Sequence, residues 1–461
     1  MYDQWVEAFE EDKLSAVFML DLSAAFDVVD HEILIQKLEI YGFEECCISW
    51  FQSYLTNRSQ QVYVEGSLSD PLLLEAGVPQ GSILGPILYI LYTNDLAEVV
   101  HDHNPTPPQD QDPLQPAQDP PHEGQEDQPY DVHDQQQDLQ VANAEHPPQL
   151  PGLGVQEPPH SLYFNINCES CGGICIFADD STFTLSNQDP AQLTLDIRSK
   201  YKEIASYMSK NKLILNSDKT HLLVMTSSRK HLNHQNFGIT LDTGTEIIEP
   251  GYAERLLGVI ISNNMKWNDH VRDGENSLTR ILTSRINALC KVSAYSSFKT
   301  RKMIANGVVM SHITYLIQLY GGCSEQLLSS LQVLQNKAAR LVTKLDWRTP
   351  TSTLMLQCGW LSVRQMIAYH SLLLLFKTKQ TRKPGYIFSK INNKFNQRTR
   401  HATMGGSRDN RRFQSTLAQA SFLPRTIKMW NEKLPGNIRS EECLNNFKEK
   451  IKTWIKQDIK I

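Results

Sequence analysis

The sequence predicts a fold of the α+β class, and two observations carry this prediction. In the first half of the 461 residues, short apolar runs that are typical of buried strands alternate with longer segments of helical period. From about Ser277 onward the hydrophobic period is almost wholly helical. We therefore expect a region of strands and helices first, and one or two α-helical domains after it.

The first predicted strand is the apolar run Ala16–Leu20, which ends directly at Asp21. A short continuous run of this kind is typical of a buried strand, so the acid lies at the strand's exit. Farther along, the patterns predict a helix at 31–41, a β-hairpin that pairs 60–65 with 72–75, and a helix from about 82 to 96.

Two more strands are predicted at Gly173–Phe177 and Thr182–Leu185, joined by Ala178-Asp179-Asp180-Ser181. A long helix follows at about 190–210, and later helical periods are clearest at 328–345 and 363–377. The turn between the two strands therefore carries a pair of adjacent acids.

Composition limits the location of the chain. The hydrophobic content is 40%, and the longest apolar stretches, 83–92 and 372–376, are shorter than the roughly 20 residues that span a bilayer. No signal-peptide pattern opens the sequence, and nine cysteines, an odd number, do not suggest a disulfide framework. We expect an intracellular protein, in the nucleus or cytoplasm, that is not secreted and does not enter a membrane.

Charge is distributed unevenly along the chain. Residues 101–160 contain twelve Asp and Glu and no Lys or Arg, so the rest of the chain is basic although the whole carries −6. From Leu361 to Ile461 there are 21 Lys and Arg against six Asp and Glu. Such an excess is expected of a protein that contacts a phosphate backbone. The alternative is a basic face that is merely solvated.

Residues 101–160 are also rich in Pro, Gln and Asp and nearly free of large apolar side chains. A segment of this composition buries too little surface to offset its ordering entropy, so we expect a disordered acidic insertion. It is either a tolerated insertion without chemistry or an acidic segment that competes with nucleic acid for a basic groove.

The three acids Asp21, Asp179 and Asp180 come from two separate segments that the predicted strands could bring together. Carboxylates from separate segments are the ligands that a pair of divalent ions about 3.5–4 Å apart requires. An Asp-Asp pair in a turn is ordinarily only turn chemistry. The sequence around the acids therefore decides between the two interpretations.

That surrounding sequence resembles the reverse transcriptases of non-LTR retrotransposons, of the jockey-like kind. Five segments match the family's motifs in the right order, namely Phe18–Asp27 (motif A), Gly77–Ser82 with Leu84–Pro86 (motif B), Phe177–Asp180 (motif C), Leu213–Thr220 (motif D) and Arg255–Val259 with Trp267 and His270 (primer grip). Weaker similarity to the tail of these elements continues through Leu334–Arg340 and Trp430–Pro435.

The resemblance implies that Asp21, Asp179 and Asp180 form the catalytic cluster and ligate two Mg²⁺ ions, with Mn²⁺ as an alternative metal. It makes the Leu22 carbonyl a further oxygen ligand, and it places Phe26 beneath the incoming sugar, where a bulky ring favours deoxynucleotides. Phe26 on its own is equally well a core aromatic.

The resemblance also implies that Gln80 and Gly81 contact the incoming nucleotide and template, and that Lys219 lies near the leaving pyrophosphate. A lone lysine of this kind is more often a solvated charge. The implied partners are an RNA template, a DNA primer and deoxynucleoside triphosphates.

As an architecture, the resemblance implies a polymerase palm, an antiparallel sheet with helices on one face, from residues 1–100 with 161–230. A primer grip and helical thumb would follow at 231–345, and a basic helical region at 346–461. Only about twenty residues precede motif A, so we expect the fingers to be largely missing, and whether a partner chain supplies them stays open.

Two further patterns receive separate interpretations. Cys168, Cys171 and Cys175 have a spacing that resembles a zinc site, but no fourth ligand follows at a sensible distance, so we expect no zinc. The cluster of arginines near Phe413 combines positive charge with an aromatic ring, as nucleic-acid-binding surfaces do. Its members are Arg398, Arg400, Arg408, Arg411 and Arg412.

Three hypotheses about function remain at this point. The chain is an RNA-directed DNA polymerase, a catalytically inactive remnant that only binds RNA or DNA, or an inert fragment. The ordered motifs favour the first as the family's activity, whereas the missing fingers favour the second for this particular chain. The function that we expect is that of a reverse transcriptase.

Overall fold

The computed structural model describes residues 1–96, 165–168, 172–177, 180–226, 238–392 and 415–458. The acidic segment expected at 101–160 lies outside these ranges, as do Asp179 and the arginine cluster near Phe413. Among the described helices, none is both long and apolar enough to cross a membrane.

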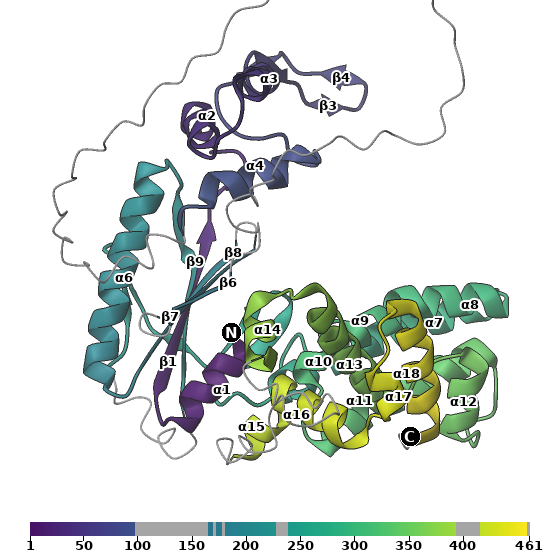
Figure 1. The fold of residues 1–461 in the computed structure, drawn as a ribbon. Helices are drawn as coiled ribbons and strands as arrows, with labels where there is room; N and C mark the ends of the chain where they lie inside the picture. The colour runs from purple at the N-terminus through teal and green to yellow at the C-terminus, as the bar shows by residue number, and fades with distance from the viewer. Residues whose placement is uncertain (97–164, 169–171, 178–179, 227–237, 393–414, 459–461) are drawn as a thin grey trace, which may run out of the picture. The chain divides into compact units, whose positions relative to one another are not determined.

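A six-stranded sheet forms the centre of the first half of the chain (Figure 1). Its strands, in spatial order, are β12 (Pro250–Gly251), β9 (Leu215–Met225), β1 (Leu14–Leu22), β8 (Asp180–Asn187), β7 (Gly172–Phe177) and β6 (Asn165–Cys168). The pairs within it are antiparallel except β12 with β9. The predicted strands after Ala16 and on both sides of the acidic turn are confirmed, and the α+β class with them.

The central strand β1 is covered on both faces because its side chains alternate between two cores. Phe18 and Leu20 join the core that α6 (Pro190–Lys210) and α4 (Leu84–Thr93) build, whereas Val17 joins a second core with Trp5. Trp5 belongs to α1 (Tyr2–Glu10), which the sequence patterns did not predict. The expectation of helices on one face is therefore wrong for this end of the sheet, since α1 packs on the opposite face from α6.

Helix α6 illustrates why the sequence patterns worked locally. Asp189 caps its N-terminus by accepting a hydrogen bond from the Ala191 amide at 3.1 Å, and Pro190 occupies the first turn. Its buried residues recur every three or four positions toward the sheet, beginning with Leu193 and Ile197. The predicted bounds match the observed ones.

Four small antiparallel ladders complete the strands. They are β2 (Arg58–Gln60) with β5 (Leu72–Leu74), β3 (Tyr63–Val64) with β4 (Ser67–Leu68), β10 (Leu241–Asp242) with β11 (Ile247–Ile248), and β13 (Ala253–Leu256) with β14 (Val259–Ser262). The predicted hairpin around Gly66 is thus present, but it is divided into two short ladders.

The second half of the described chain is almost wholly helical, as the period predicted. Its helices are α7 (Leu278–Ser293), α8 (Phe298–Ala305), α9 (Ser311–Thr314), α10 (Ile317–Tyr320), α11 (Glu325–Thr343), α12 (Thr351–Cys358), α13 (Val363–Thr381), α14 (Gly385–Asn392), α15 (Thr416–Ala420), α16 (Phe422–Lys428), α17 (Gly436–Arg439) and α18 (Leu444–Asp458). Three π-helical turns lie at Asp269–Asp273, Asn306–Met310 and Met429–Lys433.

A buried polar network holds the remaining helices, α2 (His31–Ile40) and α3 (Glu45–Leu55), to the sheet core through α2. Lys37 is only 8% exposed, and its ammonium donates to the Tyr92 carbonyl at 2.6 Å and to the Asp95 carboxylate at 2.7 Å. The Tyr207 hydroxyl donates to the same carboxylate at 2.6 Å. Burial lowers the pKa of Lys37, and the hydrogen bond to Asp95 opposes that shift.

Replacing Lys37 with Met is expected to lower the free energy of unfolding by about 2 kcal/mol, because Asp95 and the Tyr92 carbonyl lose their shared donor. The figure stays modest because the Asp95 side chain is 36% exposed and water partly replaces the lost partner. Denaturant unfolding measures the change. Lys202→Met, at an exposed position of α6, is the control, and an equal loss in both variants would contradict the network's role.

Candidate active site

The site begins where β1 ends, at Asp21. The register of β1 against β9 shifts between Met19 and Asp21, which pair with His221 and Asn216 respectively. Three extra residues of β9 are therefore accommodated in a bulge opposite the acid. Lys219 lies in that bulge, and its ammonium is 3.1 Å from Oδ2 of Asp21. The two residues that the motifs assigned to one site are thus brought into contact.

The second acidic segment is placed by the pairing of β1 with β8. Leu20 pairs with Ser181, so Asp21 and Asp180 would be the next pair in the same antiparallel register. Phe177 pairs with Asp180, so two residues of sequence separate β7 from β8. Asp179 is one of these two residues and lies outside the described residues. Asp180 is exposed at the start of β8.

The donor set suits divalent ions with oxygen ligands. Oδ2 of Asp21 is buried and receives no hydrogen bond from the described residues, although the Lys219 ammonium lies nearby. A buried carboxylate oxygen without a hydrogen bond is costly unless a cation lies beside it. The Lys219 ammonium supplies such a charge here, and a divalent ion at the same oxygen would supply a stronger one. The described residues alone contain no cluster of three acidic, His or Cys side chains with ligating geometry, and the assigned third acid, Asp179, is not among them. Leu22 is buried as the last residue of β1.

The loop that carries Gln80 and Gly81 is held against the segment after Asp21. The Gly77 amide donates to the Val29 carbonyl and the Val78 amide to the Phe26 carbonyl, both at 2.8 Å. The Gln80 side-chain amide donates to both carboxylate oxygens of Asp27 at 3.0 Å. Asp27 belongs to the same motif-like run as Asp21 but had no predicted role.

Phe26 and Gly81 differ in how closely their surroundings hold them. Phe26 is half-buried, and its ring lies 4.8 Å from that of the buried Tyr89. This contact serves both interpretations of Phe26, since the ring packs on the core and keeps an accessible side. Gly81 has a φ of +78° and open space where a Cβ would lie.

Gly77→Ala is expected to destabilise this loop more than Gly81→Ala. Both glycines have positive φ, which costs a residue with a Cβ roughly 1 kcal/mol or more, but only at Gly77 would the Cβ lie 2.8 Å from the Asp27 carbonyl oxygen. Thermal unfolding of the two variants measures the difference. Equal melting temperatures would show that the close approach of Gly77 to Asp27 is relaxed in solution.

Two further motif residues, Trp267 and His270, are buried and support the fold. Trp267 and His270 are 6% and 7% exposed, and the Nδ1 of His270 accepts a 3.4 Å hydrogen bond from the Ile260 amide of β14. Burial, and after it the charge of nearby Arg255, lower the pKa of His270 to about 4. His270 therefore acts as a neutral acceptor that fixes the β13–β14 hairpin.

The segment Leu334–Arg340 is likewise structural within α11. Gln335 is fully buried and donates to the Leu361 carbonyl at 2.8 Å, and Asn336 donates to the Thr351 hydroxyl at 2.8 Å. These bonds tie α11 to the segments that begin α12 and α13. Trp430, in the other tail motif, is 1% exposed and stacks near Phe447.

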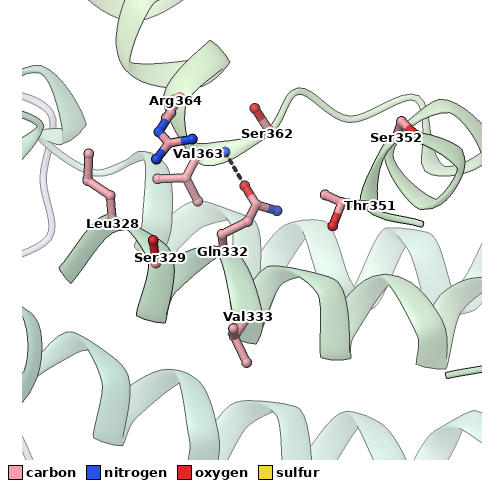
Figure 2. A pocket seen from close by; sticks show the side chains of 9 residues that line it. All are labelled: Leu328, Ser329, Gln332, Val333, Thr351, Ser352, Ser362, Val363 and Arg364. Carbon is pink, nitrogen blue, oxygen red and sulfur yellow. Dashed lines mark hydrogen bonds between the residues drawn. The ribbon is translucent and has the colours of Figure 1, made fainter. Parts of the chain in front are cut away.

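A pocket of about 450 Å³ lies between α11 and the first turns of α12 and α13 (Figure 2). Its dashed contact is the Val363 amide donating to Gln332 at 2.9 Å. None of the residues that the motifs assigned to chemistry lines this pocket, and Arg364 at its rim is ion-paired with Glu325. The pocket therefore does not belong to the site at Asp21.

Comparisons with known proteins agree with the motif order. Residues 4–111 match the family described as reverse transcriptase (RNA-dependent DNA polymerase). The chain is 24% identical over 371 residues to the probable RNA-directed DNA polymerase from transposon BS of Drosophila melanogaster, covering 79% of this chain and 33% of that protein. The corresponding protein of transposon X-element, from the same organism, is 23% identical, with 80% and 33% covered.

Another match is shorter but has a higher sequence identity. The RNA-directed DNA polymerase from mobile element jockey of Drosophila melanogaster is 36% identical over 91 residues, or 20% of this chain and 10% of that protein. Among solved structures, a telomerase from Candida tropicalis in complex with a fragment of telomeric RNA gives a TM-score of 0.33 at 10% identity, covering 100% of this chain and 51% of that one, and we draw nothing from it.

The chain spans about a third of the length of the curated relatives that it matches over most of its own length. The family match includes Asp21, the loop at Gln80 and the helix that follows it. Together with the ordered motifs, these matches identify the chain as a relative of the reverse transcriptases of jockey-like non-LTR retrotransposons.

Proposed function

We propose that the chain is an RNA-directed DNA polymerase that adds deoxynucleotides to a primer 3′ hydroxyl on an RNA template. The single observation that carries the proposal is the convergence at the end of β1. Asp21 contacts Lys219 at 3.1 Å, and the register of β1 with β8 makes Asp180 the next partner of Asp21. Three segments far apart in sequence thus meet at one point.

Asp21, Asp179 and Asp180 are the proposed ligands of two Mg²⁺ ions, and Mn²⁺ is an alternative. When bound, these ions stabilise the charge that develops on the attacking and leaving oxygens. The buried Oδ2 of Asp21, which lacks a hydrogen bond from the described residues, supports this assignment. The Leu22 carbonyl, at the same strand end, is the further oxygen proposed.

The other site residues position the substrates. Lys219 is 65% exposed beside Asp21, so its ammonium can turn toward the negative charge of a departing pyrophosphate. Phe26, supported by Tyr89, offers a ring against the sugar of the incoming nucleotide. The loop that carries Gln80 and Gly81 faces the template and nucleotide with a backbone that the contacts to Phe26 and Val29 hold in place.

A basic helical surface supports a nucleic-acid partner. Residues 276–324 contain six Lys and Arg and no Asp or Glu. Arg280 and Lys291 line a groove of about 650 Å³ along α7 together with small and polar side chains. Lysines and arginines free of neighbouring acids are suited to phosphate contacts. In family terms, we propose a palm built from 1–100 with 161–230, a primer grip and thumb at 231–345, and a basic helical region at 346–461.

The same basic groove favours a second candidate, a chain that binds RNA or DNA without synthesis. Primer extension on an RNA template with Mg²⁺ and deoxynucleotides separates the two, when the chain is compared with Asp179→Asn. Extension that the substitution abolishes supports the polymerase. Salt-sensitive RNA binding without extension would overturn the polymerase and leave the binding protein.

A further inference from the structure

The turn of the β13–β14 hairpin is backbone-strained. Leu256 pairs with Val259, so Leu257 and Gly258 form a two-residue turn, and their φ angles are +45° and +82°. Two positive φ values are what a type I′ hairpin turn requires, and Asn or Gly normally supplies them. A leucine in this conformation is unusual and persists only where its surroundings hold it.

Tyr315 supplies such a hold from a distant part of the chain. Its hydroxyl donates to the Leu257 carbonyl at 2.7 Å, across 58 residues of sequence. Its ring also lies against the turn, because a Cβ added at Gly258 would be 3.3 Å from the ring carbon Cε1. The turn is therefore clamped by one hydrogen bond and one surface of contact.

The backbone around Tyr315 is held in place although about half of the residue is exposed. The residue ends α9, where its amide donates to the Ser311 carbonyl at 3.0 Å. Ile313 before it and Ile317 after it are fully buried. Leu316, which follows directly, also has a positive φ, so the chain turns sharply into α10 at this point. Tyr315 thus couples the position of the helical region to the position of the hairpin turn.

We propose that Tyr315 is a positioning residue that sets the place of the primer 3′ end through the Leu257–Gly258 turn. The proposal rests on the proposed function, in which this hairpin is the primer grip. The base of the hairpin is fixed separately, by His270 through the Ile260 amide. Tyr315 is therefore the contact that fixes the tip, and loss of its hydroxyl leaves the base and the core intact.

The test is Tyr315→Phe, which removes one oxygen and keeps the ring. We expect kcat for primer extension to fall about fivefold, the effect of one lost hydrogen bond on alignment, with KM for the deoxynucleotide and the melting temperature unchanged. Tyr252→Phe is the control, because its hydroxyl is similarly exposed but bonds Asn264 at the base of the same hairpin. This control should extend the primer like the wild type.

A second pair of variants tests the same turn from its other side. Gly258→Ala should lower kcat as Tyr315→Phe does, since the new methyl group meets the ring. Gly244→Ala, at a φ of +86° with open space, adds the same strain elsewhere and should leave kcat unchanged. Equal losses in the two alanine variants would overturn the clamp.

The outcomes separate this proposal from the proposed function. If Tyr315→Phe extends like the wild type, or loses activity only in proportion to a fall in melting temperature, the positioning role is overturned. If the wild type itself does not extend the primer, the proposed function fails instead. Hydrogen exchange of the Val259 amide then decides the clamp: faster exchange in Tyr315→Phe supports it, and unchanged exchange overturns it.

Discussion

Asp21→Asn is expected to lower the rate of primer extension by at least about 100-fold while leaving the fold intact. Residues that only support a metal ligand typically contribute 10–100-fold, so loss of a ligand's charge should cost no less. The amide has the same size as the carboxylate, and the buried Oδ2 of Asp21 has no hydrogen bond from the described residues to lose. The ion pair with Lys219 is lost, but the lysine is 65% exposed and the pair contributes little, so the melting temperature should change little.

The variant also separates catalysis from binding. RNA affinity, measured by titration at two salt concentrations, should be unchanged, because the basic groove on α7 is untouched. The double variant Asp179→Asn with Asp180→Asn should behave in the same way, and loss of RNA binding there would count against this division of roles. Asp196→Asn on α6 serves as the control. Extension by Asp21→Asn within threefold of the wild type would remove Asp21 from the metal site.

Acid is expected to destabilise the protein through His270. Burial lowers the pKa of this imidazole to about 4, below the ordinary value of about 6.5. Between these two values the unfolded chain takes up a proton that the folded chain refuses. The contribution of His270 is therefore fully present above pH 6.5 and is lost as the pH falls, by about 3 kcal/mol at pH 4.

Denaturant unfolding between pH 4 and 7 measures this loss as the difference between the wild type and His270→Phe. The phenyl ring keeps the contacts with Trp267 and Tyr320 but cannot take a proton. Burial also lowers the pKa of His370, which both proteins retain, so the difference isolates His270. His221→Gln, at a half-exposed position, is the control. Parallel stability curves for the wild type and His270→Phe would contradict the assignment.

Local patterns explain which parts of the fold the sequence could predict. The strand before Asp21, the two strands around the acidic turn and the bounds of α6 follow from period, capping and turn chemistry, which act within a few residues. Helix α1 was not predicted although its buried Tyr2, Trp5 and Val6 recur at helical spacing, because nine residues are a short window for that period and their partners lie far away in sequence. Trp5, for example, donates to Thr184 at 3.1 Å.

The candidate site also has parts that the sequence predicts and parts that it does not. Motif order predicted which residues belong together, and the contact of Lys219 with Asp21 agrees with it. The bulge in β9 that makes this contact depends on strand register, which no local pattern specifies. The clamp of Leu257 by Tyr315 and the acceptor role of His270 join segments that are distant or buried, so only the structure reveals them.

Asp21, from β1, is proposed to hold the same pair of divalent ions as Asp179 and Asp180. Mn²⁺ binding, followed by electron paramagnetic resonance with an RNA template, a DNA primer and a non-hydrolysable deoxynucleotide present, tests this proposal most directly. We expect two bound ions per chain in the wild type and at least tenfold weaker binding in both Asp21→Asn and Asp179→Asn. Unchanged Mn²⁺ affinity in either variant would contradict it.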